Sequence, residues 1–210
     1  AGGSDQATVS ITVNPVNDAP ALTDIINQET SEDTSMVLTL IATDVDGDDL
    51  TYGAVSQDTS RVQVEIDGDQ LTLIPTVNWN GSVNISVSVS DGEFTDSEVF
   101  VLTVNPVNDF PVAEDDSAVL SEDGSIGGNV MDNDSDVDAN FNDPSEYFDL
   151  SVVLVDNTLN GTLSINGDGS WTYVPDANWN GLDSFTYEIS DAAGGSDQAT
   201  VSITVNPVND

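Results

Sequence analysis

The sequence predicts an all-β protein built from two tandem antiparallel β-sandwiches in an elongated rod. Three observations carry this prediction: the chain repeats itself, apolar residues alternate with polar ones along short runs, and Asn-Gly or Asp-Gly pairs separate these runs. No stretch shows the sustained 3.6-residue period of a helix. The repeat sets the number of domains, and the alternation sets their class.

The internal repeat defines the domain boundaries. Residues 1–18, AGGSDQATVSITVNPVND, reappear letter for letter as residues 193–210, and VNPVND occurs again at 104–109. Self-similarity at a fixed spacing is typical of arrays of like domains. We therefore predict the terminal strand and linker of a preceding repeat at 1–18, a first sandwich at 19–109 and a second at 110–210.

Alternation predicts the strands within each repeat. Val83, Ile85, Val87 and Val89 alternate with Asn and Ser, which is typical of a strand with one buried and one wetted face. The Asn-Gly and Asp-Gly pairs accept the positive φ of tight turns. Roughly seven strands per repeat give each the size of an immunoglobulin-like sandwich. The terminal strand at 5–13 lacks a domain of its own and is predicted to be an exposed edge.

The second repeat carries about ten additional residues. Glu32 matches Glu122 at an offset of 90, whereas Leu50 matches Leu150 at an offset of 100. We align Asp44-Val-Asp46 with Asp134-Ser-Asp136, also at an offset of 90. This alignment predicts a ten-residue loop insertion near 139–148.

Composition excludes most functions. The 210 residues include one basic and 39 acidic side chains, no His and no Cys, for a formal charge of −38. A chain without His, Cys or Lys cannot build a Ser-His-Asp triad, a thiolate nucleophile or a Schiff base, so we expect no enzyme activity. Such a negative surface repels nucleic acid and anionic lipid, and we expect neither nucleic-acid binding nor membrane insertion. Oxygen ligands are abundant, and they are what Ca²⁺ requires.

Acidic residues cluster at predicted strand ends in both repeats. Two carboxylates about 4 Å apart repel by roughly 4 kcal/mol at an effective dielectric constant near 20, so repeated clustering favours a bound cation. We predict cages that combine linker residues with loop residues of the adjoining repeats. The candidate ligands are Asn17, Asp18, Glu32, Asp33, Asp44, Asp46, Asp91, Asn108, Asp109, Asp134, Asp136 and Asp191.

Other interpretations of these residues remain open. Any single Asp in a turn is more often a solvated charge that favours solubility. Asp132 to Asp143 follows the ligand spacing of an EF-hand loop but has Val137 where that loop needs Gly. Trp79 and Trp179, each in an Asn-Trp-Asn-Gly segment, could stack on sugars, although a plug over the end of the sandwich is the commoner role. Paired carboxylates could serve a glycosidase, but their recurrence in each repeat favours structure over one active site.

The chain resembles the cadherin-like tandem repeats of large bacterial RTX adhesins, which are exported by type I secretion. The resemblance covers nearly the whole chain and rests on VNPVNDAP and VNPVNDFP at the linkers, DVDGDDL at 44–50, and Ser-Asp at 90 and 190. Two departures stand out: PTVNWNG and PDANWNG replace the LDRE ligand motif of cadherins, and Asn105 replaces the first linker Asp. Fewer charged ligands imply fewer or weaker sites than in animal cadherins.

The resemblance implies a function for the array. We expect calcium-stiffened extender repeats that project a ligand-binding region from the bacterial cell surface, in an extracellular setting and in biofilm formation. The partners would be calcium ions and adjacent repeats of the same chain, and the chain would be a monomer. The alternative is that the repeats themselves bind a glycan or mediate homophilic cell adhesion.

Overall fold

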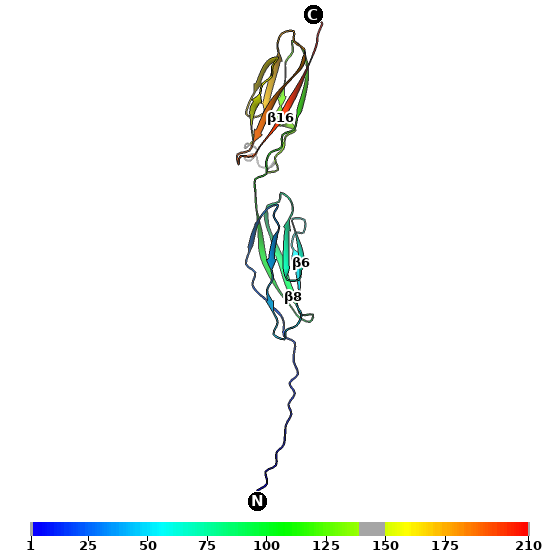
Figure 1. The fold of residues 1–210 in the computed structure, drawn as a ribbon, viewed down its shortest axis with the longest axis vertical. Helices are drawn as coiled ribbons and strands as arrows, with labels where there is room; N and C mark the ends of the chain where they lie inside the picture. The colour runs from blue at the N-terminus through cyan, green and yellow to red at the C-terminus, as the bar shows by residue number, and fades with distance from the viewer. Residues whose placement is uncertain (1, 139–149, 210) are drawn as a thin grey trace. The chain divides into compact units, whose positions relative to one another are not determined.

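The computed structural model describes residues 2–138 and 150–209, which form two compact β-sandwich units (Figure 1). The units are Ala1–Val107 and Asn108–Asp210. The boundary between the units follows Val107, two residues earlier than the boundary predicted after Asp109. Asn108 and Asp109 hydrogen-bond to loops of the second unit. The two units are called the first and second domains below. The predicted insertion near 139–148 lies outside the described residues. No helix in the described ranges has the length and apolarity needed to cross a membrane.

The first domain packs a four-stranded sheet, ordered β2-β9-β8-β5, against a three-stranded sheet, ordered β3-β7-β6. A short pair, β1 with β4, completes it. Its strands are β1 (Ala21–Leu22), β2 (Gln28–Ser31), β3 (Met36–Thr39), β4 (Ala42–Thr43), β5 (Thr51–Ser56), β6 (Val62–Asp67), β7 (Gln70–Pro75), β8 (Gly81–Ser90) and β9 (Thr95–Asn105).

The second domain repeats this plan with sheets ordered β10-β16-β15-β12 and β11-β14-β13. A short 3-10 helix, η1 (Val130–Asp132), follows β11. The strands are β10 (Asp116–Ser121), β11 (Ile126–Asn129), β12 (Ser151–Asp156), β13 (Gly161–Ile165), β14 (Ser170–Pro175), β15 (Gly181–Ser190) and β16 (Ser196–Asn206). The two large sheets of each domain supply seven strands within the described residues, as the sequence predicts.

The alternating sequence produces the core. In β8 the four apolar residues that alternate with Asn and Ser are all buried. Aromatic residues take more of this role in the second domain, where Phe185 and Tyr187 are buried and Phe185 packs edge-to-face on Trp171 with centroids 5.3 Å apart. Burying one face of every long strand against the opposite sheet fixes the register, because a one-residue slip would expose the whole apolar set.

One strand pair in each domain is parallel, although we expected antiparallel sheets. β2 lies parallel to β9, and β10 lies parallel to β16. In each domain the first strand of the four-stranded sheet, β2 or β10, therefore runs in the same direction as the last strand, β9 or β16. Within each domain the chain therefore enters at one end, here called the N-terminal pole, and leaves at the other, the C-terminal pole.

The N-terminal segment is exposed but forms no strand. Residues 2–20 belong to no strand of the described chain, and Figure 1 draws them as an extended trace. The side chains of Val9, Ile11 and Val13 are 82, 83 and 86% exposed. The predicted exposure is confirmed, whereas the predicted strand at 5–13 is absent because no neighbouring strand accepts its backbone hydrogen bonds.

Candidate metal centre

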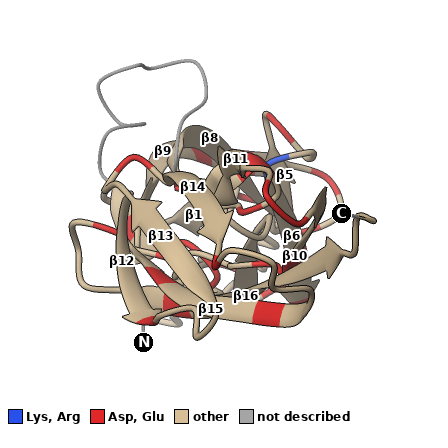
Figure 2. Cartoon of the chain, turned by 90° about the horizontal axis from the view of Figure 1, so that it is seen from above, with Lys and Arg blue, Asp and Glu red and all other residues tan. Residues whose placement is uncertain are grey.

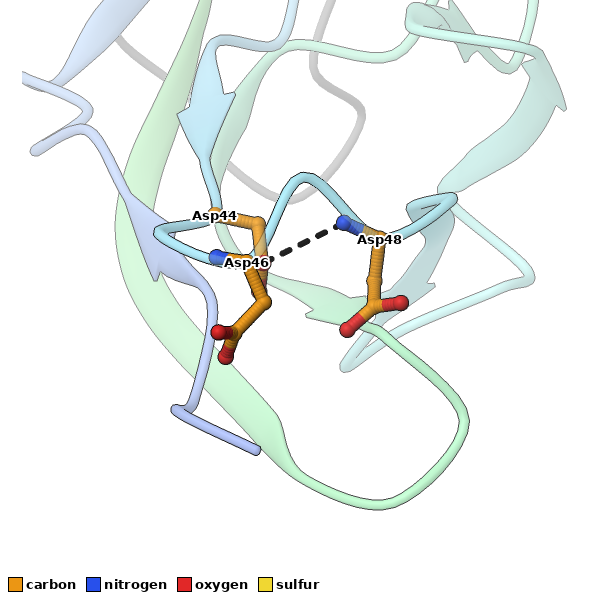
Figure 3. Close-up of side chains that lie close together, drawn as sticks. All are labelled: Asp44, Asp46 and Asp48. Atoms are coloured by element: carbon orange, nitrogen blue, oxygen red, sulfur yellow. Dashed lines mark hydrogen bonds between the residues drawn. The ribbon is translucent and has the colours of Figure 1, made fainter. Parts of the chain in front are cut away.

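Three carboxylates of a single loop lie close together at the N-terminal pole of the first domain. Asp44, Asp46 and Asp48 follow β4, and each offers an oxygen that lies within 4.8 Å of the others (Figure 3). The Asp44 Oδ1 atom accepts hydrogen bonds from the backbone N–H groups of Asp46 and Gly47, both at 2.9 Å, and of Asp48 at 3.3 Å. Gly47 has φ +78°, which lets the loop turn this tightly. The loop thus wraps around the Asp44 carboxylate and brings the carboxylates of Asp46 and Asp48 close to it.

The environment of these carboxylates fits a hard cation. The Asp44 Oδ2 atom is buried and has no hydrogen-bond partner within the described chain. Partial loss of solvation and the carboxylates of Asp44, Asp46 and Asp91 raise the pKa of Asp48. A divalent cation would satisfy the buried oxygen and remove the repulsion, and Ca²⁺ takes six to eight such oxygen ligands.

The linker before the first domain bonds to this cluster. The backbone N–H of Asp18 donates to Asp46 Oδ2 at 2.8 Å, and Asn17 Nδ2 donates to Asp91 Oδ2 at 2.9 Å. Hydrogen bonds from the N–H groups of Phe94 and Glu93 and from Asn17 hold the pKa of Asp91 below its usual range. The linker, the Asp44–Asp48 loop and the turn after β8 therefore meet at one pole.

The second domain has the same arrangement. The N–H of Asp109 donates to Asp138 Oδ2 at 2.6 Å, and Asn108 Nδ2 donates to Asp191 Oδ2 at 2.9 Å. The N–H of Asp138 donates to Asp136 Oδ1 at 3.0 Å, as Asp46 does to Asp44. Asn108 and the backbone of the turn after β15 hold the pKa of Asp191 below its usual range.

These bonds correct the alignment of the two repeats. Asp136-Val-Asp138 occupies the position of Asp44-Val-Asp46, at an offset of 92, instead of the expected Asp134-Ser-Asp136. Two of the ten additional residues therefore precede this loop. Asp134 turns toward the core, where its carboxylate accepts from the Glu114 N–H at 2.8 Å and the Tyr187 hydroxyl at 3.1 Å.

Sequence reasoning missed Asp48 and Asp138. The signal for Asp138 was present, because Asp-Val-Asp recurs letter for letter at 136–138. The signal for Asp48 was its place two residues after Asp46 in an Asp-x-Asp-x-Asp run. The second domain has Asn140 at the corresponding sequence position, which lies outside the described residues.

The C-terminal poles carry buried glutamates. Glu32 is only 3% exposed and accepts from the backbone N–H of Val107 at 2.7 Å. Glu122 is 7% exposed and accepts from Val208 at 2.6 Å. Both glutamates therefore lie at the pole opposite the Asp-Val-Asp loop of their own domain. Asp33 lies beside Glu32, and its Oδ1 accepts from the Asn78 N–H at 2.9 Å.

The comparisons with known proteins agree with this architecture. A family described as "Bacterial cadherin-like domain" matches residues 108–207, and one described as "Cadherin-like domain" matches residues 16–105. The chain carries two tandem cadherin-like domains. A search of curated proteins found no match.

Solved structures share the fold of this cadherin-like pair. Human protocadherin-24 EC1-2 matches with a TM-score of 0.54 at 20% identity, over 92% of this chain and 100% of that one. Human mucin-like protocadherin EC1-2 matches with a TM-score of 0.53 at 18% identity, over 90 and 98%. An endo-fucoidan hydrolase of glycoside hydrolase family 107 matches over 94% of this chain at 19% identity and a TM-score of 0.40. The chain spans only 30% of that enzyme.

Both cadherin-like domains close their C-terminal pole with a tryptophan. Trp79 and Trp179 are half-buried and pack against their respective cores, which favours the plug over the sugar platform. A Cβ atom at Gly81 would lie 2.9 Å from the Trp79 ring, and one at Gly181 would lie 3.2 Å from Trp179. The Asn-Trp-Asn-Gly segment thus needs its glycine so that the ring can lie over the chain.

The second cadherin-like domain also contains a half-buried acidic pair, Asp116 and Asp134. The Asp116 Oδ2 atom is buried without a hydrogen-bond partner within the described residues. Burial and the charges of Asp134 and Asp132 raise the pKa of Asp116 to about 6. Burial, followed by the charge of Asp134, raises the pKa of Tyr187. Because Asp132 ends η1 and Asp134 bonds to Tyr187, the EF-hand interpretation gains no support, and Asp143 lies outside the described residues.

Proposed function

We propose that the chain is a pair of calcium-stiffened extender repeats from a bacterial cell-surface adhesin, which hold a ligand-binding region away from the cell. Cadherin-like domains often bind calcium, are typically extracellular and are typically non-catalytic. The charge of −38 agrees with a demand for cations, and acidic residues recur on the loops of both domains (Figure 2).

One repeated observation carries the proposal. In both domains the linker residue before the sandwich donates its backbone N–H to the second Asp of an Asp-Val-Asp loop, and the Asn before it donates to the Asp after the penultimate strand. The same two contacts, formed once in each domain, support a set of oxygen ligands around each linker. We propose these ligands: Asn17, Asp18, Asp44, Asp46, Asp48 and Asp91 in the first domain, and Asn108, Asp109, Asp136, Asp138 and Asp191 in the second.

Three of the predicted ligands stand apart from these sets. Asp134 is left out, because Tyr187 and Glu114 already occupy its oxygens. Glu32 and Asp33 are proposed as additional oxygen ligands from the C-terminal pole of the first domain, since Glu32 accepts from Val107, the residue directly before Asn108.

The chain direction within each domain suits a linear array. Because the first and last long strands are parallel, a domain receives the chain at one pole and passes it on at the other. Adjacent repeats are then the natural partners of each pole. A cation that binds the linker and the Asp-Val-Asp loop together would limit linker motion, which otherwise is the default between domains in one chain.

Thermal unfolding with and without calcium tests the binding part of this proposal. One site at a free ion concentration of 100 times its dissociation constant adds about 2.7 kcal/mol. Extracellular calcium modules often bind at about 10⁻⁴ to 10⁻³ M, so we expect a higher Tm in millimolar calcium than in chelator. An unchanged melting curve, together with no heat on titration, would refute it. Magnesium at the same concentration controls for simple charge screening.

A further inference from the structure

Asn-Gly pairs occur at four places in this chain, and they differ in how the Asn is held. They begin at Asn80, Asn160, Asn166 and Asn180. Such a pair is chemically labile, because the Gly backbone nitrogen can attack the Asn side-chain amide and Gly has no Cβ atom to hinder the approach. The reaction requires the Asn side chain and the peptide plane that follows it to turn toward each other. A hydrogen bond that fixes either group therefore slows the reaction.

Two of the four pairs are held through their peptide plane. The Asn160 carbonyl accepts from the Asp176 N–H at 2.9 Å and from the Tyr173 hydroxyl at 3.1 Å. The Asn166 carbonyl accepts from the Gly169 N–H at 3.0 Å. Each of these carbonyls shares its peptide plane with the Gly nitrogen that would attack. The bonds therefore keep the attacking nitrogen in place.

The other two pairs match each other except for one hydrogen bond. Asn80 and Asn180 lie in the same Asn-Trp-Asn-Gly sequence, and both are exposed. The glycines that follow them have nearly the same conformation, with φ +142° at Gly81 and +145° at Gly181. The Asn180 Nδ2 atom donates to Glu122 Oε2 at 3.2 Å, whereas the side-chain amide of Asn80 makes no hydrogen bond within the described residues. The first domain thus leaves free an amide that the second domain holds.

We propose that Asn80-Gly81 is the site of spontaneous deamidation in the folded chain. The Gly81 nitrogen loses its proton and bonds to the Asn80 Cγ atom. The bond from Cγ to the side-chain nitrogen then breaks, and this nitrogen takes up a proton and leaves as ammonia. Water opens the resulting five-membered imide at either carbonyl carbon, which gives aspartate or isoaspartate. Water is the only co-reactant, and no oxidant or reductant takes part.

The modification changes the C-terminal pole of the first domain. Either product adds one negative charge to the −38 of the chain. Isoaspartate also routes the main chain through the former side chain, which lengthens the backbone by one methylene group. The turn has little room for this change, because a Cβ atom at Gly81 would lie 2.9 Å from the Trp79 ring. The modification therefore acts on both the charge of this pole and its tryptophan plug.

Peptide mass spectrometry of the full chain, incubated folded at mildly alkaline pH, tests the assignment. We expect Asn80 to deamidate at least about tenfold faster than Asn180, the rate factor that corresponds to one hydrogen bond with a charged acceptor. The same chain unfolded in denaturant is the reference, in which all four Asn-Gly pairs should react at similar rates. Equal rates at Asn80 and Asn180 in the folded chain, or a faster reaction at Asn160 or Asn166, would overturn the proposal.

Glu122→Gln tests the protecting hydrogen bond directly. The Glu122 Oε1 atom accepts from the Val208 N–H at 2.6 Å, so a Gln with its oxygen in that place presents an NH₂ group to Asn180 and cannot accept from it. We expect the rate at Asn180 to rise toward that at Asn80, with the variant shown to be folded by circular dichroism. Asn80→Gln is the control that should remove the fast reaction from the first domain. An unchanged rate at Asn180 in folded Glu122→Gln would contradict the proposed protection.

Discussion

At the residue scale, the determining feature is how each carboxylate is held. The Asp44 side chain fixes its loop through one oxygen and leaves the other buried without a partner in the described chain. Asp91 and Asp191 are held by backbone N–H groups and by the amide of the preceding linker, and their pKa values are lowered. These contacts organise the acidic residues without a bound ion.

Asp44→Asn should remove most of the calcium stabilisation of the first domain. The amide keeps an oxygen that can accept the loop N–H groups but loses the charge that a cation would neutralise. We expect the calcium-dependent increase in unfolding free energy to fall by about 1–2 kcal/mol, measured by calorimetry in calcium and in chelator. Asp67→Asn, at the last residue of β6, is the matched charge control. Equal losses in both variants would indicate a general charge effect.

Asp116 should make the second domain less stable as pH rises. Its folded pKa of about 6 lies above the ordinary value of 3.8. The contribution of Asp116 to folding stability is therefore fully present below about pH 4, where the carboxyl is protonated, and is lost as pH rises through about 6. The groups that face it are Asp134, Asp132, Asp115 and Tyr187.

Asp116→Asn should flatten this part of the pH dependence. In chelator at pH 7 we expect the variant to melt at a temperature higher by roughly 4 °C, the shift that about 1 kcal/mol produces in a domain of this size. Denaturant unfolding between pH 5 and 7.5 provides the measurement. If the stability of the unmodified chain did not decrease across this range, ionising Asp116 would cost no folding free energy and the prediction would be wrong.

At the element scale, the turn before the penultimate strand is closely constrained by its tryptophan. Gly181 has φ +145°, and a Cβ atom there would lie 3.2 Å from Trp179. Gly181→Ala should therefore destabilise the second domain by about 1–3 kcal/mol through backbone strain and displacement of the ring. Gly167→Ala, at a position with open space, is the control in the same domain. Denaturant unfolding would contradict this if the two variants were equally stable.

The strands could be predicted from sequence because their signal is local. A period of two in β8 and β15 determines which side chains are buried, and Asn-Gly determines where the chain turns. The position of Asp134 could not be predicted, because its partner Tyr187 lies 53 residues away in the sequence. In the run Asp132 to Asp138, alternate residues look equivalent, and only the distant hydroxyl selects which of them turns inward.

Long-range contacts also decide the parallel strand pair and whether the N-terminal segment forms a strand. β2 meets β9 across about 70 intervening residues, a separation that no local pattern encodes. Ser4–Asn14 has the alternation of a strand but forms none, whereas β16 does, with the same sequence. The strand pattern is therefore necessary, and the neighbouring strands decide the outcome.

At the scale of the whole molecule, we propose that calcium limits motion between repeats. Each domain bonds the linker that precedes it to an acidic loop, so ions at this pole would join linker and sandwich into one rigid body. Without ions, we expect repulsion between the carboxylates to leave the linker free to bend. Stiffness is what an extender needs in order to hold a distal region away from a surface.

Small-angle scattering of the full chain at several calcium concentrations tests this claim most directly. We predict that the maximum dimension becomes longer and more narrowly distributed as calcium rises into the millimolar range, and that chelator reverses the change. Asp136→Ala should abolish the response while the second domain stays folded by circular dichroism, because Asp136 belongs to the proposed ligand set. A distribution that is equally long and narrow in chelator, or a response that Asp136→Ala leaves intact, would contradict the proposal that calcium stiffens these repeats.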